Sequence, residues 1–271
     1  MRKIICPTDF SETAFQAIAY AAKLAKKMNS ELTLFNVQSL MELTPEAALM
    51  GKNYNVEMAE AMLEEQCEEV SKVFKISCYG NVATRFGSFH KAISEKAIGY
   101  DLVIMGTNGP DDFFQFFTGS NTYQVIKKSS VPVLLLPEGY GYTDISRIAY
   151  AFNYLHNHHP PVTQLARLVK QLECDLSIVQ VIEKCSREAE EELLDSQEKI
   201  LDLYGSEISI LFDTRHASDV SEVLNNFVIQ EKIDMLALCS VHHNFTDKLF
   251  HRSVIKTLSG IASYPVFVFH A

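Results

Sequence analysis

The stretch GTNGPDDFFQFFTGS carries three glycines with a spacing that suits anion binding. Two residues separate Gly106 from Gly109, nine more precede Gly119, and Ser120 follows directly. Glycine has no Cβ, so the backbone can turn tightly or approach a ligand closely. If a helix begins near Gly119, its first N–H groups are unpaired and lie at the positive end of the helix dipole. We therefore expect a phosphate site here, with the Ser120 hydroxyl as cap or donor and Asn121 as a further donor. A plain strand exit followed by a helix cap is the alternative.

A second group of side chains that could bind a ligand is a set of histidines in the second half of the chain. They are His156, His158, His159, His242 and His243. The first three follow one expected strand and the last two follow another. Imidazoles that converge at neighbouring strand exits can bind Zn²⁺ or another transition metal. Solvated loop histidines, or a pH-sensitive surface, are the alternatives.

Both groups depend on the strands and helices that position them. Apolar runs predict strands at 3–8, 31–37, 75–84, 101–106 and 131–137. Helical patterns lie between them at 11–27, about 44–74 and 88–98, and a further helix opens near 119. Alternation of this kind predicts an α/β fold, with a doubly wound, Rossmann-like parallel sheet covered by helices on both faces. Ligands bind beyond the carboxyl ends of the strands in such a sheet, and Gly106 lies on that edge.

The second half of the chain repeats the first. Residues near the start of each copy match at a shift of 144, as Ile4 does with Ile148, and residues near the end match at a shift of 133. The first copy therefore carries eleven more residues in its middle, and the pattern indicates a duplicated domain. A join rich in Gly and Pro at 137–144 separates the copies. We expect two tandem five-stranded domains, 1–138 and 146–271, packed as an intramolecular pseudo-dimer through their last strands, whose apolar edges would otherwise invite aggregation.

The pattern G-x2-G-x9-G-S after the strand DLVIMG, with PTDFS at the exit of the first strand, resembles the universal stress protein family. The likeness extends over both halves, so the chain resembles a tandem member. This resemblance implies a regulatory protein that binds an adenine nucleotide, ATP or AMP or ADP, and domains that pair through their last strands. It places Asp9 near the nucleoside, the backbone of Val37 at adenine, and the glycine loop with Ser120 and Asn121 at ribose and phosphates. A helix cap for Asp9 and a core position for Val37 are the alternatives.

The second copy lacks the glycines of the first. Cys239, His242 and Arg252 stand where the first copy has glycine, and only the serine survives, as Ser253. Each replacement adds a Cβ where the backbone should approach phosphate, and makes a positive φ costly. We therefore expect one competent site in each chain, in the first copy, and a structural role for the second copy.

The loop 106–120 contains neither lysine nor arginine. Hydrolysis requires a positioned water, a base and neutralisation of charge. The sequence therefore favours binding over turnover, with a slow ATPase of the same fold or a non-binding interaction scaffold as the alternatives. Asp111 and Asp112 would repel a triphosphate unless Mg²⁺ lies between them, which leaves AMP and ADP open beside Mg²⁺-ATP.

The composition of the chain argues against nucleic-acid binding, membrane insertion and secretion. The 271 residues carry a formal charge of −10, whereas broad nucleic-acid binding requires a positive surface. No run approaches the roughly 20 apolar residues of a membrane span, and the N-terminus lacks the features of a signal peptide. Six scattered cysteines without a CxxC read as core residues of a cytoplasmic protein. Whether two chains associate further is left open.

Overall fold

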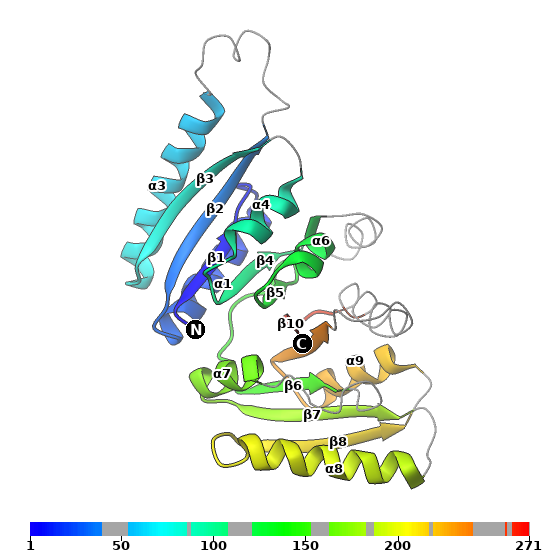
Figure 1. Ribbon diagram of the computed structural model, residues 1–271. Coiled ribbons are helices and arrows are strands. Elements are labelled where there is room, and N and C mark those ends of the chain that lie inside the picture. Colours follow the sequence, from blue (N-terminus) through cyan, green and yellow to red (C-terminus); the bar gives the residue numbers. More distant parts are fainter. Residues whose placement is uncertain are drawn as a thin grey trace. The chain divides into compact units, whose positions relative to one another are not determined.

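The computed structural model describes residues 1–39, 54–85, 88–107, 121–152, 163–182, 187–216, 219–240, 258 and 262–270. These residues belong to two compact units, Met1–Tyr142 and Thr143–Ala271, called unit 1 and unit 2 below. Each unit consists of parallel strands with helices packed against them (Figure 1). The predicted α/β, Rossmann-like fold is confirmed. None of the helices that the structure describes has the length and apolar character needed to cross a bilayer.

Unit 1 alternates strands and helices along the chain. The elements are β1 (Lys3–Pro7), α1 (Glu12–Lys27), β2 (Glu31–Ser39), α3 (Tyr54–Phe74), β3 (Cys78–Arg85), α4 (Phe89–Lys96), β4 (Leu102–Gly106), α6 (Asn121–Lys128) and β5 (Val133–Leu136). The strands pair in parallel in the order β3-β2-β1-β4-β5. Helix α1 packs on α3 and on the central strands, while α4 and α6 pack on each other. The direction of winding reverses between β1 and β4, which makes this pair the switch point of the sheet.

The core of unit 1 follows from the apolar runs of its central strands. Ile4 and Ile5 of β1 are fully buried, because helices cover both faces of the strand. The buried face of α1 is rich in alanine, so its backbone can approach the sheet closely. Leu24 on this face is fully buried, and its burial contributes about 1.5–3 kcal/mol. The acidic and basic residues at the two ends of α1 complement its dipole.

Unit 2 has the same plan with one helix fewer among the described residues. Its elements are β6 (Arg147–Ala151), α7 (Thr163–Leu172), β7 (Asp175–Ile182), α8 (Arg187–Tyr204), β8 (Ile210–His216), α9 (Val220–Gln230), β9 (Met235–Ser240) and β10 (Val266–His270). These strands pair in parallel in the order β10-β9-β6-β7-β8. The order matches that of unit 1 strand for strand.

The pairing registers of the two units correspond as well. Ile4 pairs with Leu102 in unit 1, and Ile148 pairs with Met235 in unit 2. The two members of this pair are related by the shifts of 144 and 133 that relate the two sequences. Register is strongly specified in a buried sheet, since a slip of one residue would turn every side chain to the other face. The two halves therefore build the same central strand pairs.

A carboxylate holds the first strand of each unit to the fourth in the same way. Asp101 Oδ2 accepts hydrogen bonds from the backbone N–H groups of Arg2, at 2.7 Å, and Lys3, at 3.0 Å. Asp234 Oδ2 accepts from the backbone N–H groups of Ser146, at 2.8 Å, and Arg147, at 2.9 Å. Hydrogen bonds to charged groups are stronger than neutral ones.

Several element boundaries differ from the predicted ones. β3 begins at Cys78 and not at 75, because Lys75 has a φ of 58° and ends α3 with a left-handed residue. β2 continues to Ser39, two residues beyond the predicted end, because its last residues still pair with β3. The first ten residues of the predicted helix at 44–74 lie outside the described residues.

Candidate functional site

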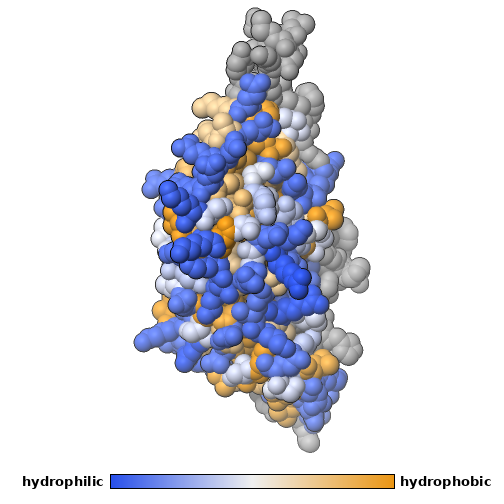
Figure 2. Space-filling model, turned by 90° about the vertical axis from the view of Figure 1, so that its left-hand side faces the viewer, coloured by the Kyte–Doolittle hydropathy of each residue, from blue (hydrophilic) through white to orange (hydrophobic). Residues whose placement is uncertain are grey.

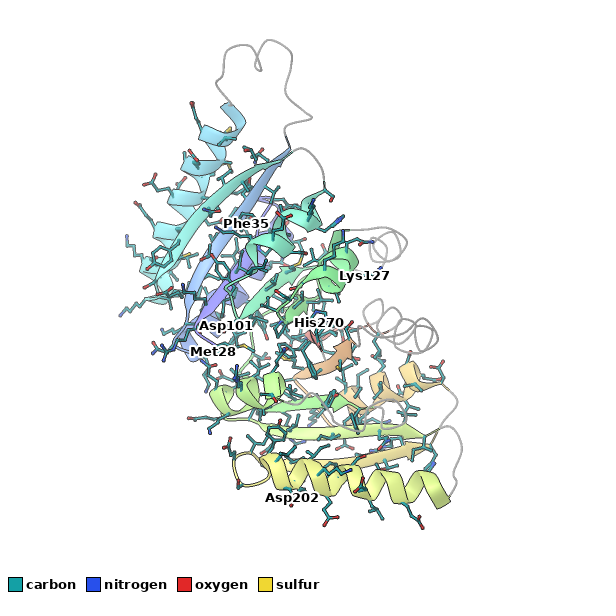
Figure 3. All side chains as sticks on the ribbon, in the orientation of Figure 1. Met28, Phe35, Asp101, Lys127, Asp202 and His270 are labelled. Carbon is teal, nitrogen blue, oxygen red and sulfur yellow. The ribbon has the colours of Figure 1, made fainter. Side chains whose placement is uncertain are left out.

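The candidate site is the carboxyl edge of unit 1, where β1, β2 and β4 end. Parallel strands deliver their carboxyl ends to one edge, so the segments that follow these strands lie close together. Phe35, labelled in Figure 3, is the last residue of β2 that pairs with β1. Its carbonyl accepts a hydrogen bond from the backbone N–H of Thr8, at 2.9 Å. Beyond this bond β1 leaves the sheet and β2 continues.

The turn after β1 places a carboxylate at this edge. Asp9 is exposed, and its Oδ1 accepts from the backbone N–H of Ser11, at 3.0 Å. The Thr8 hydroxyl oxygen accepts from the backbone N–H of Phe10, at 3.1 Å. Phe10 has a φ of 64°, a left-handed conformation that costs a bulky residue about 1 kcal/mol or more. Two side chains thus hold a strained turn that keeps Asp9 at the end of β1.

The helix after this turn is capped by Ser11 and not by Asp9. Ser11 Oγ accepts from the backbone N–H of Ala14, at 3.2 Å, and α1 begins at the next residue, Glu12. The alternative in which Asp9 caps the helix is therefore wrong. Asp9 shapes the turn instead, and its carboxylate remains exposed beside the switch point.

Val37 lies within β2 rather than at its end, and its backbone is oriented toward the candidate site. The N–H of Glu31 and the carbonyl of Phe35 bond to the β1 side, so the peptide groups of odd-numbered residues in β2 face that side. The β1 ladder has ended before Val37, whose other neighbour, Ala83, pairs on the β3 side. The N–H and C=O of Val37 therefore face the space that β1 leaves. Its side chain is half-buried.

A buried amide supports this edge, and it was not among the predicted site residues. Asn36 is 3% exposed, and its Nδ2 donates to the carbonyl of Thr8, at 2.8 Å. Its Oδ1 accepts from Gln38 Nε2, at 2.6 Å. A buried amide must find partners, and this one ties the exit of β1 to β2. The signal in the sequence is a polar residue inside the apolar run ELTLFNV.

Gly106 ends β4 at the predicted position, but its lack of a side chain serves a contact within the protein. A Cβ at this residue would lie 2.9 Å from Thr13 Cγ2, 3.1 Å from the Thr13 carbonyl oxygen and 3.5 Å from Ala17 Cβ. Gly99 and Gly139 are the glycines with positive φ among the described residues, so Gly106 does not need the left-handed region. The first turn of α1 crosses directly over the end of β4, which only glycine allows.

The remaining members of the predicted phosphate loop are only partly described. Gly109, Gly119 and Ser120 lie outside the described residues. Asn121 is the first residue of α6, so a helix does begin directly after the predicted loop. The last residue before the loop, Thr107, donates its backbone N–H to the carbonyl of Leu136, at 2.8 Å. The structure thus brings Asp9, Val37 and Gly106 to one edge and leaves the loop interior untested.

The same edge of unit 2 is built from different side chains. Cys239 occupies the place of Gly106 and is 6% exposed. Burial raises the pKa of its thiol to about 12, and Tyr150 is its hydrogen-bond partner. Tyr150 packs on Phe269 of β10, with ring centroids 5.3 Å apart. The place that a glycine holds in unit 1 is thus filled by a buried thiol and an aromatic cluster.

The predicted metal site lies outside the described residues. None of His156, His158, His159, His242 and His243 is among them. Within the described ranges, no group of three or more His, Cys, Asp or Glu residues is arranged to hold a metal ion. The histidine site therefore stays a prediction.

Known proteins that resemble this chain include members of the universal stress protein family. A model of the Universal stress protein family matches residues 1–137. Universal stress protein MJ0577 of Methanocaldococcus jannaschii is 29% identical over 154 residues, which are 50% of this chain and 94% of that protein. Universal stress protein MJ0531 of the same organism is 26% identical over 141 residues, 50% of this chain and 81% of that protein. The crystal structure of a universal stress protein from Archaeoglobus fulgidus is similar over 99% of this chain and 98% of its own, with 18% identity and a TM-score of 0.77.

Proposed function

Because the chain belongs to the universal stress protein family, we propose that it binds one adenine nucleotide, at the carboxyl edge of unit 1, and acts as a regulatory binding protein. The observation that carries this proposal is the juxtaposition of two features. The peptide groups of Val37 face the space left by β1, and the exposed carboxylate of Asp9 lies at the end of β1 itself. The residues predicted to contact the phosphates directly precede the start of α6 in the sequence.

The backbone of Val37 suits the edge of an adenine ring. A backbone C=O accepts a hydrogen bond and a backbone N–H donates one. Adenine offers the matching pair, with its exocyclic amino group as donor and a ring nitrogen as acceptor. Guanine presents an oxygen and an N–H at these positions, so donor would meet donor and acceptor would meet acceptor. Buried polar groups without partners are costly, and we expect adenine to be preferred over guanine by at least about 10-fold.

Asp9 suits the sugar of the nucleotide. A carboxylate at the end of a strand in such a sheet commonly accepts hydrogen bonds from ribose hydroxyls. The Oδ1 atom of Asp9 is bonded to the turn, which fixes the orientation of the carboxylate. Asp111 and Asp112 of the predicted phosphate loop disfavour a triphosphate close to them, unless Mg²⁺ neutralises the charge. We therefore expect ATP to require Mg²⁺ and AMP to bind without it.

The phosphates would then lie at the start of α6. Helix N-termini bind phosphate through unpaired N–H groups, and Asn121 begins this helix. Gly109, Gly119 and Ser120 are the loop residues proposed to line the phosphates, with Gly106 at the base of the loop. In unit 2 the counterparts of the three glycines have side chains, and we propose that unit 2 binds no nucleotide at its corresponding edge. Pairing of the two units through their last strands stays a prediction.

Calorimetric titration of the full chain with AMP, ADP, ATP and GTP tests the proposal, with and without Mg²⁺. Removal of the Asp9 carboxylate in Asp9→Ala should weaken AMP binding roughly 10- to 100-fold, since a hydrogen bond to a charged group contributes roughly 1.5–3 kcal/mol. Asp202→Ala removes an exposed aspartate from α8 of unit 2 and serves as the matched control. Equal affinities of both variants, or no affinity of the wild type for any adenine nucleotide, would contradict the proposal.

A further inference from the structure

A pair of thiols lies in unit 1 away from the candidate nucleotide site. It lines a groove between α3 and the edge strand β3. The groove has a volume of about 860 Å³. Cys67 of α3 and Cys78 of β3 both line it, together with exposed glutamates of α3 such as Glu64 and Glu68. Figure 2 faces this side, where hydrophilic and hydrophobic residues alternate over the surface. The groove lies away from the carboxyl edge that we propose for the nucleotide.

The two thiols are placed together by helix and strand geometry. Cys78 and Gly80 are two residues apart in β3, so they share the face of the strand that packs against α3. A Cβ built on Gly80 would lie 3.6 Å from Cys67 Sγ and 3.2 Å from Leu63 Cβ. Cys67 and Cys78 both line the same groove, and each thiol shifts the pKa of the other. The two side chains therefore lie near each other where α3 packs on β3.

The groove gives small molecules access to this pair. Cys67 is 7% exposed and Cys78 is half-buried, yet both form part of the groove wall. Gly80 also lines the groove, and a Cβ there would approach Leu63 tightly and touch Cys67 Sγ at ordinary contact distance. A thiol that lines an open groove can meet a small oxidant without unfolding of the helix.

Unit 2 provides an internal comparison at the same place in the fold. Gly80 pairs with Leu34 in unit 1, and Phe212 pairs with Ile178 at the equivalent position in unit 2. A cavity between α8 and the sheet of unit 2, which Phe212 helps to line, has a volume of about 10 Å³. Ile210 stands at the place of Cys78. The isoleucine in unit 2 indicates that an apolar side chain is enough to pack the position of Cys78. Packing alone therefore does not explain why unit 1 has a cysteine there.

We propose that Cys67 and Cys78 form a dithiol site whose substrate is a hydroperoxide, which oxidises the pair to an intramolecular disulfide. In the first step the Cys67 thiolate attacks the O–O bond, which breaks to give a sulfenic acid and, with hydrogen peroxide, one water molecule. In the second step the Cys78 sulfur attacks the sulfenic sulfur and releases a second water molecule. Both thiol protons end in water. The sulfurs together lose two electrons, and the peroxide gains them.

The environment of the pair favours Cys67 as the attacking sulfur. The hydrogen bond from Cys78 lowers the pKa of the Cys67 thiol, because it stabilises the thiolate. The same contact, together with burial, raises the pKa of Cys78. Burial alone raises the pKa of Cys6 to about 12, so this neighbouring thiol stays protonated. In unit 2, Cys174 donates its S–H to the carbonyl of Val169, at 3.7 Å.

The disulfide would join the last turns of α3 to the first residue of β3. It would close a short segment of chain, which restricts the unfolded state. Because the two cysteines lie on elements that pack against each other and line one groove, we expect the bond to require little movement of the backbone. We expect the midpoint of thermal unfolding of unit 1 to rise by roughly 3–8 °C on oxidation, and the rise to disappear after reduction.

Peptide mapping by mass spectrometry tests this proposal directly. The reduced full chain is treated with hydrogen peroxide, quenched with catalase, alkylated and digested without a reductant. We expect a peptide pair linked through Cys67 and Cys78, a loss of about 2 Da, and reversal by dithiothreitol. Cys174→Ser, the control in unit 2, should form the same link. Cys67→Ser and Cys78→Ser should lack it and show no rise in the unfolding midpoint.

The other outcomes would overturn the proposal. These are recovery of both thiols in reduced form, oxidation of Cys67 to a sulfinic acid without a link, or a link that involves another cysteine. The wild-type map decides the matter even if one serine variant fails to fold, because the linked peptide is read from the native sequence. Nucleotide affinity plays no part in this test, so its result is independent of the function proposed above.

Discussion

Replacement of Gly106 by alanine tests how the start of α1 is seated on the sheet. The added Cβ would lie 2.9 Å from Thr13 Cγ2 and 3.1 Å from the Thr13 carbonyl oxygen. Both distances are shorter than carbon and oxygen atoms tolerate without movement. The Thr13 side chain has little freedom to turn away, because β-branched residues in helices favour few rotamers. The first turn of α1 must therefore shift by a few tenths of an ångström.

The expected magnitude follows from two opposing effects. Overpacking a well-filled position costs about 1–3 kcal/mol. Alanine restricts the unfolded chain more than glycine does, which returns about 0.4–1 kcal/mol. We expect Gly106→Ala to lower the free energy of unfolding by roughly 0.5–2 kcal/mol. The shift would also move the Asp9–Ser11 turn, so AMP affinity should fall along with stability.

Gly141→Ala is the matched control. No atom lies within 4 Å of the position that its Cβ would take, and Gly141 does not have a positive φ. This variant should be as stable as the wild type or up to about 1 kcal/mol more stable. Urea unfolding followed by circular dichroism compares the two variants. If Gly106→Ala and Gly141→Ala have the same midpoint, the close approach of α1 to the end of β4 is refuted.

Three further predictions concern the capping residue, the strand-linking carboxylate and a buried thiol. Ser11→Ala removes the side chain that accepts from Ala14 and should cost about 0.5–2 kcal/mol in urea unfolding; an unchanged midpoint would argue against this cap. Asp234→Ala removes the acceptor of the backbone N–H groups of Ser146 and Arg147, which are exposed, and should cost about 0.5–1.5 kcal/mol, with Asp202→Ala as the neutral control. Burial raises the pKa of Cys239 from 9.0 to about 12. The unfolded chain therefore loses this proton first, and stability that is fully present below pH 9 falls by up to about 1.4 kcal/mol per pH unit above it. Between pH 8.5 and pH 10, the free energy of unfolding should fall less for Cys239→Ala than for the wild type. Equal falls in the two proteins would contradict the raised pKa of the Cys239 thiol.

The fold could be predicted from the sequence because its main signals are local. Continuous apolar runs between amphipathic helices leave few alternatives to a buried parallel sheet. The registers of β1 with β4 and of β6 with β9 agree with the two sequence shifts. The strand boundaries were harder to predict. The polar residues Gln38 and Ser39 resemble a loop in sequence, yet they continue the ladder with β3.

The structure places only some of the predicted site residues, and their role in binding stays a prediction. Gly106 was expected to serve a phosphate, which stays a prediction, and the structure adds that its missing side chain makes room for Thr13. That contact depends on how α1 crosses β4, and the crossing cannot be predicted from the residues close to Gly106 in sequence. The role of Ser11 as the helix cap and the position of Asn36 beneath the turn also depend on packing. The thiol pair escaped prediction for the same reason, since ten residues that include a turn separate Cys67 from Cys78.

A crystal structure of the full chain grown with AMP is the most direct test of the central claim. The account predicts one nucleotide for each chain, with the adenine edge on the peptide groups of Val37, the ribose at Asp9 and the phosphate at the start of α6. An empty carboxyl edge in unit 1, or a nucleotide bound at the corresponding edge of unit 2, would contradict it.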